Sequence, residues 1–104
     1  MEQWLLIVES NCKDKDREAE FNSWLDDIHI PDILSGTPGF KTAVRYVNRK
    51  PLPGQGKYLA LYEIETQDID RTMVAYRQNI EKKYAMGRSS DLLEVVSRRI
   101  CKIK

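Results

Sequence analysis

Six segments with secondary-structure character follow one another along this chain, and their order leaves few possible topologies. Strands are predicted where β-branched, aromatic and aliphatic residues gather without Gly or Pro, in residues 3–9, 40–48, 57–65 and 91–103. Helices are predicted where apolar residues recur at helical spacing, in residues 14–29 and in the segment that Asp68 and Asp70 open. The resulting order is strand, helix, strand, strand, helix, strand.

This order predicts the class of the fold. If each helix makes a right-handed crossover, the strands form a four-stranded antiparallel sheet of order 4-1-3-2, with both helices on one face. Such an arrangement is a ferredoxin-like α+β fold, βαββαβ. A chain of 104 residues has the length of one such domain, so residues 1–104 are expected to form a single domain.

The ends of both helices are marked by residues that favour helix termini. Asp14 or Asp16 is expected to cap the first helix. Pro31 is expected to stop or kink it, because proline biases Ile30 away from the α conformation. Gly87 is expected to close the second helix. The predicted apolar stripes are Phe21, Trp24, Leu25 and Ile28 in the first helix, and Ile69, Met73, Tyr76, Ile80 and Tyr84 in the second.

The strands are apolar on both sides, which predicts that both faces of the sheet are covered. In the first strand, Trp4, Leu6 and Val8 share one face, whereas Leu5 and Ile7 share the other. In the second strand, the two sets are Phe40, Thr42, Val44 and Tyr46 against Ala43, Arg45 and Val47.

Because both helices cover the same face, the other face would be bare in a monomer and would exceed the usual size of an exposed apolar patch. A second copy of the chain is the expected cover, which predicts a homodimer formed through the sheet faces. The candidates for that face are Leu5, Ile7, Val47, Leu59 and Leu61.

The charge balance argues against two classes of partner. The chain has 17 basic and 16 acidic side chains and a net charge of +1, whereas nucleic acids and anionic membranes require a basic excess. No apolar run approaches the roughly 20 residues that span a bilayer. The first ten residues resemble no signal peptide, so a cytoplasmic location is expected. Cys12 and Cys101 are expected at opposite ends of the sheet, as free thiols.

The segment FNSWLDDIHIPD, Phe21 to Asp32, is followed by Pro38-Gly39-Phe40 and by Ala43-x-Arg45-Tyr46. In these residues, and in element order over nearly the whole chain, the sequence resembles the dimeric α+β-barrel superfamily, which includes EthD-like proteins, muconolactone-type isomerases, antibiotic biosynthesis monooxygenases and polyketide cyclases. The resemblance implies that a small aromatic or lactone-type molecule binds between sheet and helices, without metal or organic cofactor. It implies no single reaction. Leu25 stands where many relatives have tyrosine, so one pocket hydroxyl is absent.

His29, the only histidine in the chain, is the main candidate for a catalytic residue. An imidazole exchanges protons near neutral pH and suits general acid–base catalysis. Helical geometry places it at the edge of the apolar stripe, beside Leu25. The alternative is a structural histidine that ends the helix or bonds a loop carbonyl. Residues that could orient its ring, or simply lie at the surface, are Asp26, Asp27 and Asp32.

Four further side chains could bind a substrate, and each has a structural alternative. Trp24 could form an aromatic pocket wall or belong to the core. The hydroxyls of Tyr46 and Tyr62 could meet a ligand, although cross-strand aromatic packing explains both tyrosines as well. Arg45 could bind a carboxylate through its planar fork, but an ion pair with Glu63 on the neighbouring strand is the preferred interpretation.

Two functions from different classes follow. The first is a small cofactor-independent enzyme, an isomerase, cyclase or monooxygenase, in which His29 moves a proton and tyrosines polarise a carbonyl. The second is a non-catalytic small-molecule-binding or accessory protein of the same fold. A zinc site, a phosphate-binding loop and a nucleophilic serine are not supported by any motif. Convergence of His29 with a tyrosine or an acid in one cavity would favour the enzyme.

Overall fold

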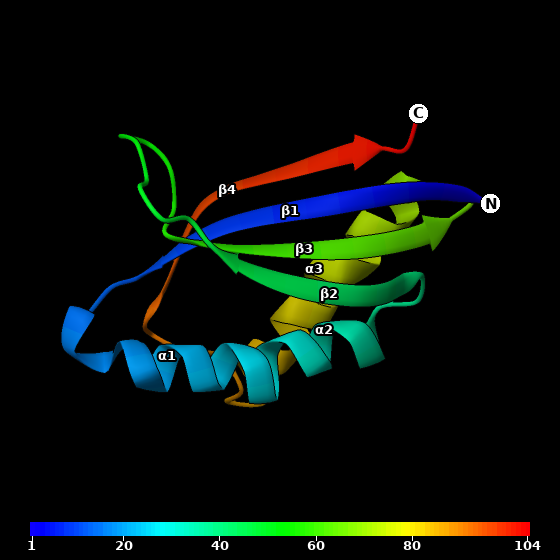
Figure 1. The fold of residues 1–104 in the computed structure, drawn as a ribbon. Coiled ribbons are helices and arrows are strands. Elements are labelled where there is room, and N and C mark those ends of the chain that lie inside the picture. Colours follow the sequence, from blue (N-terminus) through cyan, green and yellow to red (C-terminus); the bar gives the residue numbers. More distant parts are fainter.

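The computed structural model describes residues 1–104 and has the predicted order of elements (Figure 1). The strands are β1 (Glu2–Cys12), β2 (Phe40–Val47), β3 (Tyr58–Thr66) and β4 (Leu93–Lys102). The helical segments are η1 (Lys15–Arg17), α1 (Glu18–Trp24), η2 (Leu25–His29), α2 (Ile30–Gly36) and α3 (Ile69–Ala85). The first strand is therefore longer than predicted, and the last is shorter.

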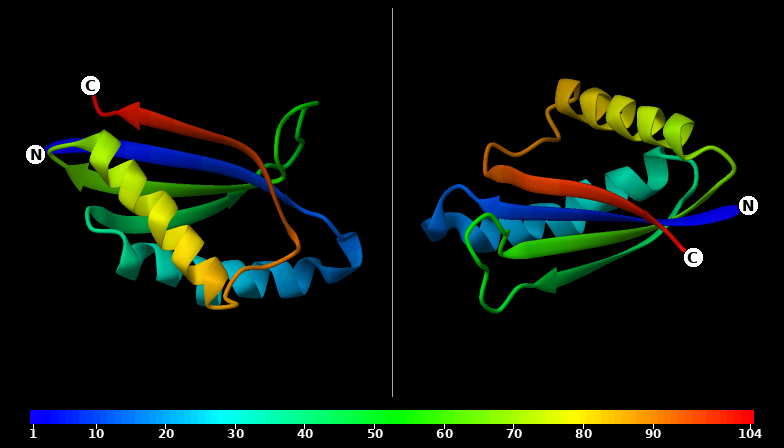
Figure 2. Two further views of the ribbon diagram at one scale, coloured as in Figure 1. Left: turned by 180° about the vertical axis from the view of Figure 1, so that it is seen from behind. Right: turned by 90° about the horizontal axis from the view of Figure 1, so that it is seen from above.

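The four strands form one antiparallel sheet of order β2-β3-β1-β4, which is the predicted ferredoxin-like order. β2 and β3 form the predicted hairpin. The helices α1, α2 and α3 lie together on one face of the sheet, and no helix covers the other face (Figures 1 and 2). None of the helices is long and apolar enough to cross a membrane.

The first helical segment does not end before Pro31, contrary to the prediction. It continues through η2 and α2 as far as Gly36. The segment η2 is a π-helical turn, in which the amide of Ile30 donates to the carbonyl of Leu25, five residues back. Pro31 then falls in the first turn of α2, where a missing N–H costs little. The π-helical turn accommodates the proline, so Ile30 keeps helical angles (φ −63°, ψ −47°).

The registers of the sheet correct two predictions about its faces. Pairing between β2 and β3 shifts by one residue between Phe40 and Thr42, which marks a bulge. The bulge turns Phe40 into the core, where it is 6% exposed, although alternation predicted that it shares a face with Tyr46. Val47 pairs with the buried Tyr58. Val47 therefore lies on the helix-facing side and not on the bare face.

The bare face nevertheless carries a continuous apolar area. β1 contributes Leu5 and Ile7, and β3 contributes Leu59 and Leu61, as predicted. β2 adds Val44 and Tyr46, which pair with the two leucines of β3. In the single chain, these two β2 side chains are 48% and 53% exposed. The bare face thus consists of Leu5, Ile7, Val44, Tyr46, Leu59 and Leu61.

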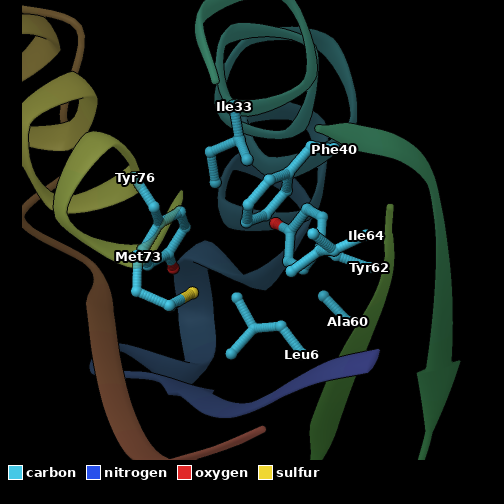
Figure 3. Packing of buried hydrophobic residues seen from close by; sticks show 8 residues of the cluster. All are labelled: Leu6, Ile33, Phe40, Ala60, Tyr62, Ile64, Met73 and Tyr76. Carbon is cyan, nitrogen blue, oxygen red and sulfur yellow. The ribbon is translucent and has the colours of Figure 1, made fainter. Parts of the chain in front are cut away.

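Two clusters of buried side chains hold the helices against the sheet. The larger joins the sheet to α2 and α3 and contains Leu6, Ile33, Phe40, Ala60, Tyr62, Ile64, Met73 and Tyr76 (Figure 3). Within it, the ring of Phe40 packs against Tyr62 and Tyr76, with centroid distances of 5.6 and 5.4 Å. The smaller cluster lies against α1 and contains Phe21, Trp24, Leu25, Tyr58 and Leu92. Tyr84 was predicted in the buried stripe of α3, but it is 72% exposed, since it lies in the last turn of that helix.

The other predicted helix termini, at Asp14, Asp68 and Gly87, are confirmed. The side chain of Asp14 accepts a hydrogen bond from the amide of Asp16 at 2.9 Å. The carboxylate of Asp68 caps α3 by accepting from the amide of Arg71 at 3.1 Å. Gly87 ends α3 with a φ of 75°, a conformation that glycine adopts readily.

The two cysteines are free thiols, as predicted. Cys12 pairs with Leu93 at the start of β4, whereas Cys101 pairs with Leu5 near the start of β1. They therefore lie at opposite ends of the sheet.

Candidate functional site

The π-helical turn η2 sets the direction of the His29 side chain. In a regular α-helix, residues five positions apart diverge by about 140°, because 3.6 residues make one turn. In a π-helical turn, the hydrogen bond spans five residues, so His29 returns above Trp24. The two rings stack with a centroid distance of 4.5 Å and an interplanar angle of 23°. The turn thus moves His29 from the predicted edge of the stripe onto its buried side.

The imidazole of His29 is partly buried, and its nitrogens make no hydrogen bond within the chain and remain accessible to solvent. Burial lowers the pKa of His29 to about 4, because desolvation disfavours the charged ring. The positive charge of Arg98 lowers this pKa further, whereas the negative charge of Asp32 acts in the opposite direction. At neutral pH the ring is therefore uncharged, and one of its nitrogens has a free lone pair.

The lowered pKa of His29 predicts an acid-sensitive fold. In the unfolded chain the ring titrates near 6.5, and in the folded chain near 4, so between these values only the unfolded chain takes up the proton. The free energy of unfolding should therefore fall as the pH falls from 6.5 to 4, by about 3 kcal/mol at about 1.36 kcal/mol per pKa unit. His29→Gln should lack this part of the pH dependence. Urea titrations of both proteins across this pH range measure it, and parallel curves would contradict the assigned burial of the ring.

An outer cavity of about 190 Å³ opens between η2, α2 and the second half of α3. Its apolar walls are Trp24, Ile33, Ile80, Tyr84 and Leu93, and its polar groups are His29, Asp32, Asn79, Lys83, Ser89 and Ser90. An apolar cavity with a few polar groups at its rim is typical of sites for small molecules.

An inner cavity of about 20 Å³ lies between the helices and the sheet, with room for about one water molecule. Polar side chains converge on it from three directions: His29 from η2, Tyr76 from α3, and Ser10, Arg45, Tyr58, Tyr62 and Arg98 from the strands. His29 and Leu93 border both cavities. The imidazole therefore stands between the large outer cavity and a small inner one, on which several polar side chains converge.

The hydroxyl of Tyr62 keeps its proton in this setting. The side chain is 2% exposed, and burial raises its pKa well above the usual value, an effect that the nearby charges of Arg45 and Arg98 only partly offset. Tyr62 is therefore a hydrogen-bond donor throughout the physiological pH range. Figure 3 shows its ring rising from β3 toward the helices, on the same side of the sheet as Tyr76.

The predicted pair between Arg45 and Glu63 is wrong. Arg45 lies on the helix-facing side of β2, whereas Glu63 pairs with Thr42 and points to the other face. The guanidinium instead donates to Asp26 at 3.0 Å and to the side-chain oxygen of Asn22 at 2.7 Å. It also lies over the ring of Tyr58, 5.3 Å from the centroid. Arg45 thus joins β2 to the first helix at the wall of the inner cavity.

The acidic residues near His29 have other partners. Asp26 pairs with Arg45, and Asp27 is exposed. Asp32 accepts two hydrogen bonds from Arg88, at 2.6 and 3.1 Å. This bidentate pair lowers the pKa of Asp32 and ties α2 to the loop that follows α3. None of the three carboxylates forms a hydrogen bond that fixes the tautomer of His29.

The structure brings four of the five predicted site residues together. His29 and Trp24 line the outer cavity, while Arg45 and Tyr62 line the inner cavity with His29. Tyr46 lies on the bare face, away from both cavities, because it alternates with Arg45 along β2. Three polar residues of the inner cavity were not predicted: Ser10, Tyr76 and Arg98. Arg98 could have been noticed in the sequence, because its charge interrupts the apolar alternation of the last strand.

Trp24→Ala should reduce stability strongly. The indole is 9% exposed, packs against Phe21 and His29, and donates from Nε1 to the carbonyl of Arg88 at 3.0 Å. Truncating a buried large aromatic residue costs about 3–5 kcal/mol. Denaturant titration measures the loss, with Trp4→Ala as the control at a less buried site. A loss below about 1 kcal/mol would mean that the indole serves only as an open cavity wall.

No protein-family model and no curated protein sequence matches this chain. Solved structures do match it. HapK from Hahella chejuensis has a TM-score of 0.61 at 13% identity, over 93% of this chain and 89% of HapK. A Bordetella bronchiseptica protein assigned to the antibiotic biosynthesis monooxygenases has a TM-score of 0.64 at 15% identity, over 100% and 97%. An EthD-family protein from Bacillus halodurans has a TM-score of 0.53 at 11% identity, over the full length of both chains.

At such low identities these similarities concern the path of the chain and not its chemistry. They cover the whole succession of strands and helices, and they agree with the sheet order and with the helices on one face. The chain has the dimeric α+β-barrel fold.

Proposed function

We propose that this protein is a small cofactor-independent enzyme that binds an aromatic or lactone-type metabolite between its helices and its sheet, with His29 as general acid or base. One observation carries the proposal: a partly buried, neutral imidazole, whose nitrogens have no partner in the chain and stay accessible, borders both an apolar cavity and a group of polar side chains. A histidine that ends the helix by binding a loop carbonyl, the structural alternative, would have one nitrogen bonded to the backbone.

The surroundings of His29 suit proton transfer next to a carbonyl or phenol. The ring of an aromatic substrate would lie in the outer cavity against Trp24. The hydroxyl of Tyr62 and the guanidinium of Arg45 would donate to the substrate oxygen that gains negative charge. A pKa near 4 makes the free imidazole a weak base. Negative charge that develops on the substrate beside Arg98 would offset the positive charge that lowers this pKa, and the ring would become more basic as the proton moves.

The names of the structural matches are compatible with this chemistry. They include proteins assigned to monooxygenases and to the EthD family. Isomerisation, cyclisation and oxygenation without a cofactor can each begin with removal of a proton from the substrate. The fold alone does not select among them.

We also propose that the protein is a homodimer whose two copies share the bare face. Proteins of this fold are typically dimeric. The bare face is a contiguous apolar area on three neighbouring strands, and no part of the chain covers it with a helix. A second copy, related by a two-fold axis, would bury the same residues on both partners.

A second function is favoured by the size of the inner cavity. At about 20 Å³ it holds no more than a water molecule, and a binding or accessory protein would need only the outer cavity. In that case ligands would bind against Trp24, and His29 would serve as a stacking partner of the indole without moving a proton.

A screen of small aromatic acids, phenols and lactones tests the proposed function. Binding is followed by the fluorescence of Trp24, with Trp24→Phe as the control that separates it from Trp4, and each ligand found is then assayed for conversion. If the protein is an enzyme, some ligands should quench the fluorescence of Trp24 and should be converted by the protein alone. Binding without conversion of any ligand would favour the accessory protein.

A further inference from the structure

We propose that the natural ligand is an aromatic carboxylic acid whose carboxylate is bound by Arg98, at the point where the inner cavity meets His29. This inference deepens the proposed function and rests on it, since it assigns a substrate class to the same site. It depends on the arrangement of three side chains from three elements: His29 of η2, Tyr76 of α3 and Arg98 of β4.

Arg98 faces the helices and lacks an acidic partner. It pairs across the sheet with Val8, on the helix-facing side. Its Nε lies 3.4 Å from the hydroxyl of Tyr76, to which it donates. Glu81 borders a shallow hollow beside Arg98, but no carboxylate lies within ion-pair distance of this guanidinium.

The other two arginines near the site are already neutralised. Arg45 pairs with Asp26, and Arg88 pairs with Asp32. The inner cavity itself is lined by two guanidiniums and by no carboxylate. The side chain of Arg98 is exposed but borders the inner cavity, and a charge-assisted hydrogen bond to a carboxylate is stronger than a hydrogen bond between neutral groups. Arg98 is therefore the only arginine of the site without an acidic partner, and Lys83 at the outer cavity is the other cation without one.

The two cavities together specify an amphipathic ligand. The outer cavity offers apolar walls for a ring, including the indole of Trp24. The inner cavity offers donors on Arg98 and Tyr62 and has room for one oxygen atom of a carboxylate. Because His29 and Leu93 border both cavities, a ring in the outer cavity can direct its carboxylate past the imidazole to Arg98. One carboxylate oxygen would take the place of a water molecule in the inner cavity, and the rest of the group would lie outside it.

Matched acids and amides test the inference. Benzoate and 2-naphthoate are titrated into the protein at pH 7.5 and compared with benzamide and 2-naphthamide, which have the same shape and no charge. Binding is measured by calorimetry. We expect each acid to bind at least about tenfold more tightly than its amide, because a hydrogen bond to a charged partner is roughly twice as strong as a neutral one.

Arg98→Gln should remove this preference and leave the affinity for the amides nearly unchanged. Arg71→Gln is the matched control, since it removes the same charge from an exposed site in α3, and it should keep the preference. If acids and amides bind equally well, or if the preference for acids survives Arg98→Gln, the inference is wrong. The proposed ligand site would still be supported, because the probes bind. If none of the four probes binds at millimolar concentration, both the inference and the proposed ligand site are wrong. Circular dichroism confirms that each variant is folded.

Discussion

Leu61→Asp is expected to convert the homodimer into a folded monomer. Leu61 lies in the middle of the bare face, paired with Ile7 on one side and Val44 on the other. In a two-fold dimer the substitution places two carboxylates in an apolar interface, one from each copy. An unpaired buried charge costs about 3–5 kcal/mol. Two such charges should weaken the dimer by at least about 10⁴-fold, at about 1.4 kcal/mol per factor of ten.

Sedimentation equilibrium at micromolar concentration measures the effect. The unmodified protein should have twice the mass of the chain, and Leu61→Asp should have the mass of one chain. Val74→Asp is the matched control, because it adds the same charge at an exposed position in α3, on the side of the helices. Leu61→Thr, which keeps a residue suited to strands, should weaken the dimer less. A folded monomer of the unmodified protein, or a dimer that survives Leu61→Asp, would contradict the proposed interface.

The fold could be predicted from the sequence because its determinants are local and repeated. Alternating apolar residues mark each strand, helical spacing marks each helix, and the order of these elements admits few topologies. The cap at Asp68 and the turn at Gly87 could be located because single residues carry those signals. The position of the bare face followed from the same alternation at Leu5 and Leu61.

The errors arose where one residue changes the register. The bulge next to Phe40 inserts a residue into β2 and reverses the side on which this ring lies. The π-helical turn before Pro31 likewise changes the side of the helix on which His29 lies. The helical segment then continues to Gly36. Both irregularities depend on tertiary packing, which rewards the burial of Phe40 and His29. Such long-range packing cannot be predicted from the local conformational preferences of the residues.

The candidate site was predicted only in part for a related reason. His29 and Trp24 could be found because both lie in one short motif. Arg98 and Tyr76 reach the site from elements far along the chain, and no short spacing connects them with His29. The partner of Arg45 could not be predicted either, since the choice between Glu63 and Asp26 depends on which face of β2 meets the helix.

His29→Ala is expected to lower turnover by at least about 10²-fold, the low end for a positioned acid–base group. The imidazole is the only titratable group that borders both cavities, and its nitrogens have no partner in the chain. Alanine leaves Trp24 and Tyr62 in place, so substrate should still bind. The loss should therefore fall mainly on kcat and less on KM.

Asp27→Ala is the matched control for this substitution. Asp27 belongs to the same π-helical turn, but its side chain is exposed and borders neither of the two cavities. Its replacement should leave kcat unchanged. Circular dichroism and sedimentation establish that both variants are folded and have the same mass as the unmodified protein, so that a loss of turnover reports on the imidazole and not on the fold.

The most direct test of the proposed function is kcat/KM for one substrate from the screen, measured for the unmodified protein, His29→Ala and Asp27→Ala. We expect a decrease of at least about 10²-fold for His29→Ala and none for Asp27→Ala. Turnover that survives His29→Ala in a folded protein would contradict the assignment of His29 as the acid or base. His29 would then be a structural residue that stacks on Trp24.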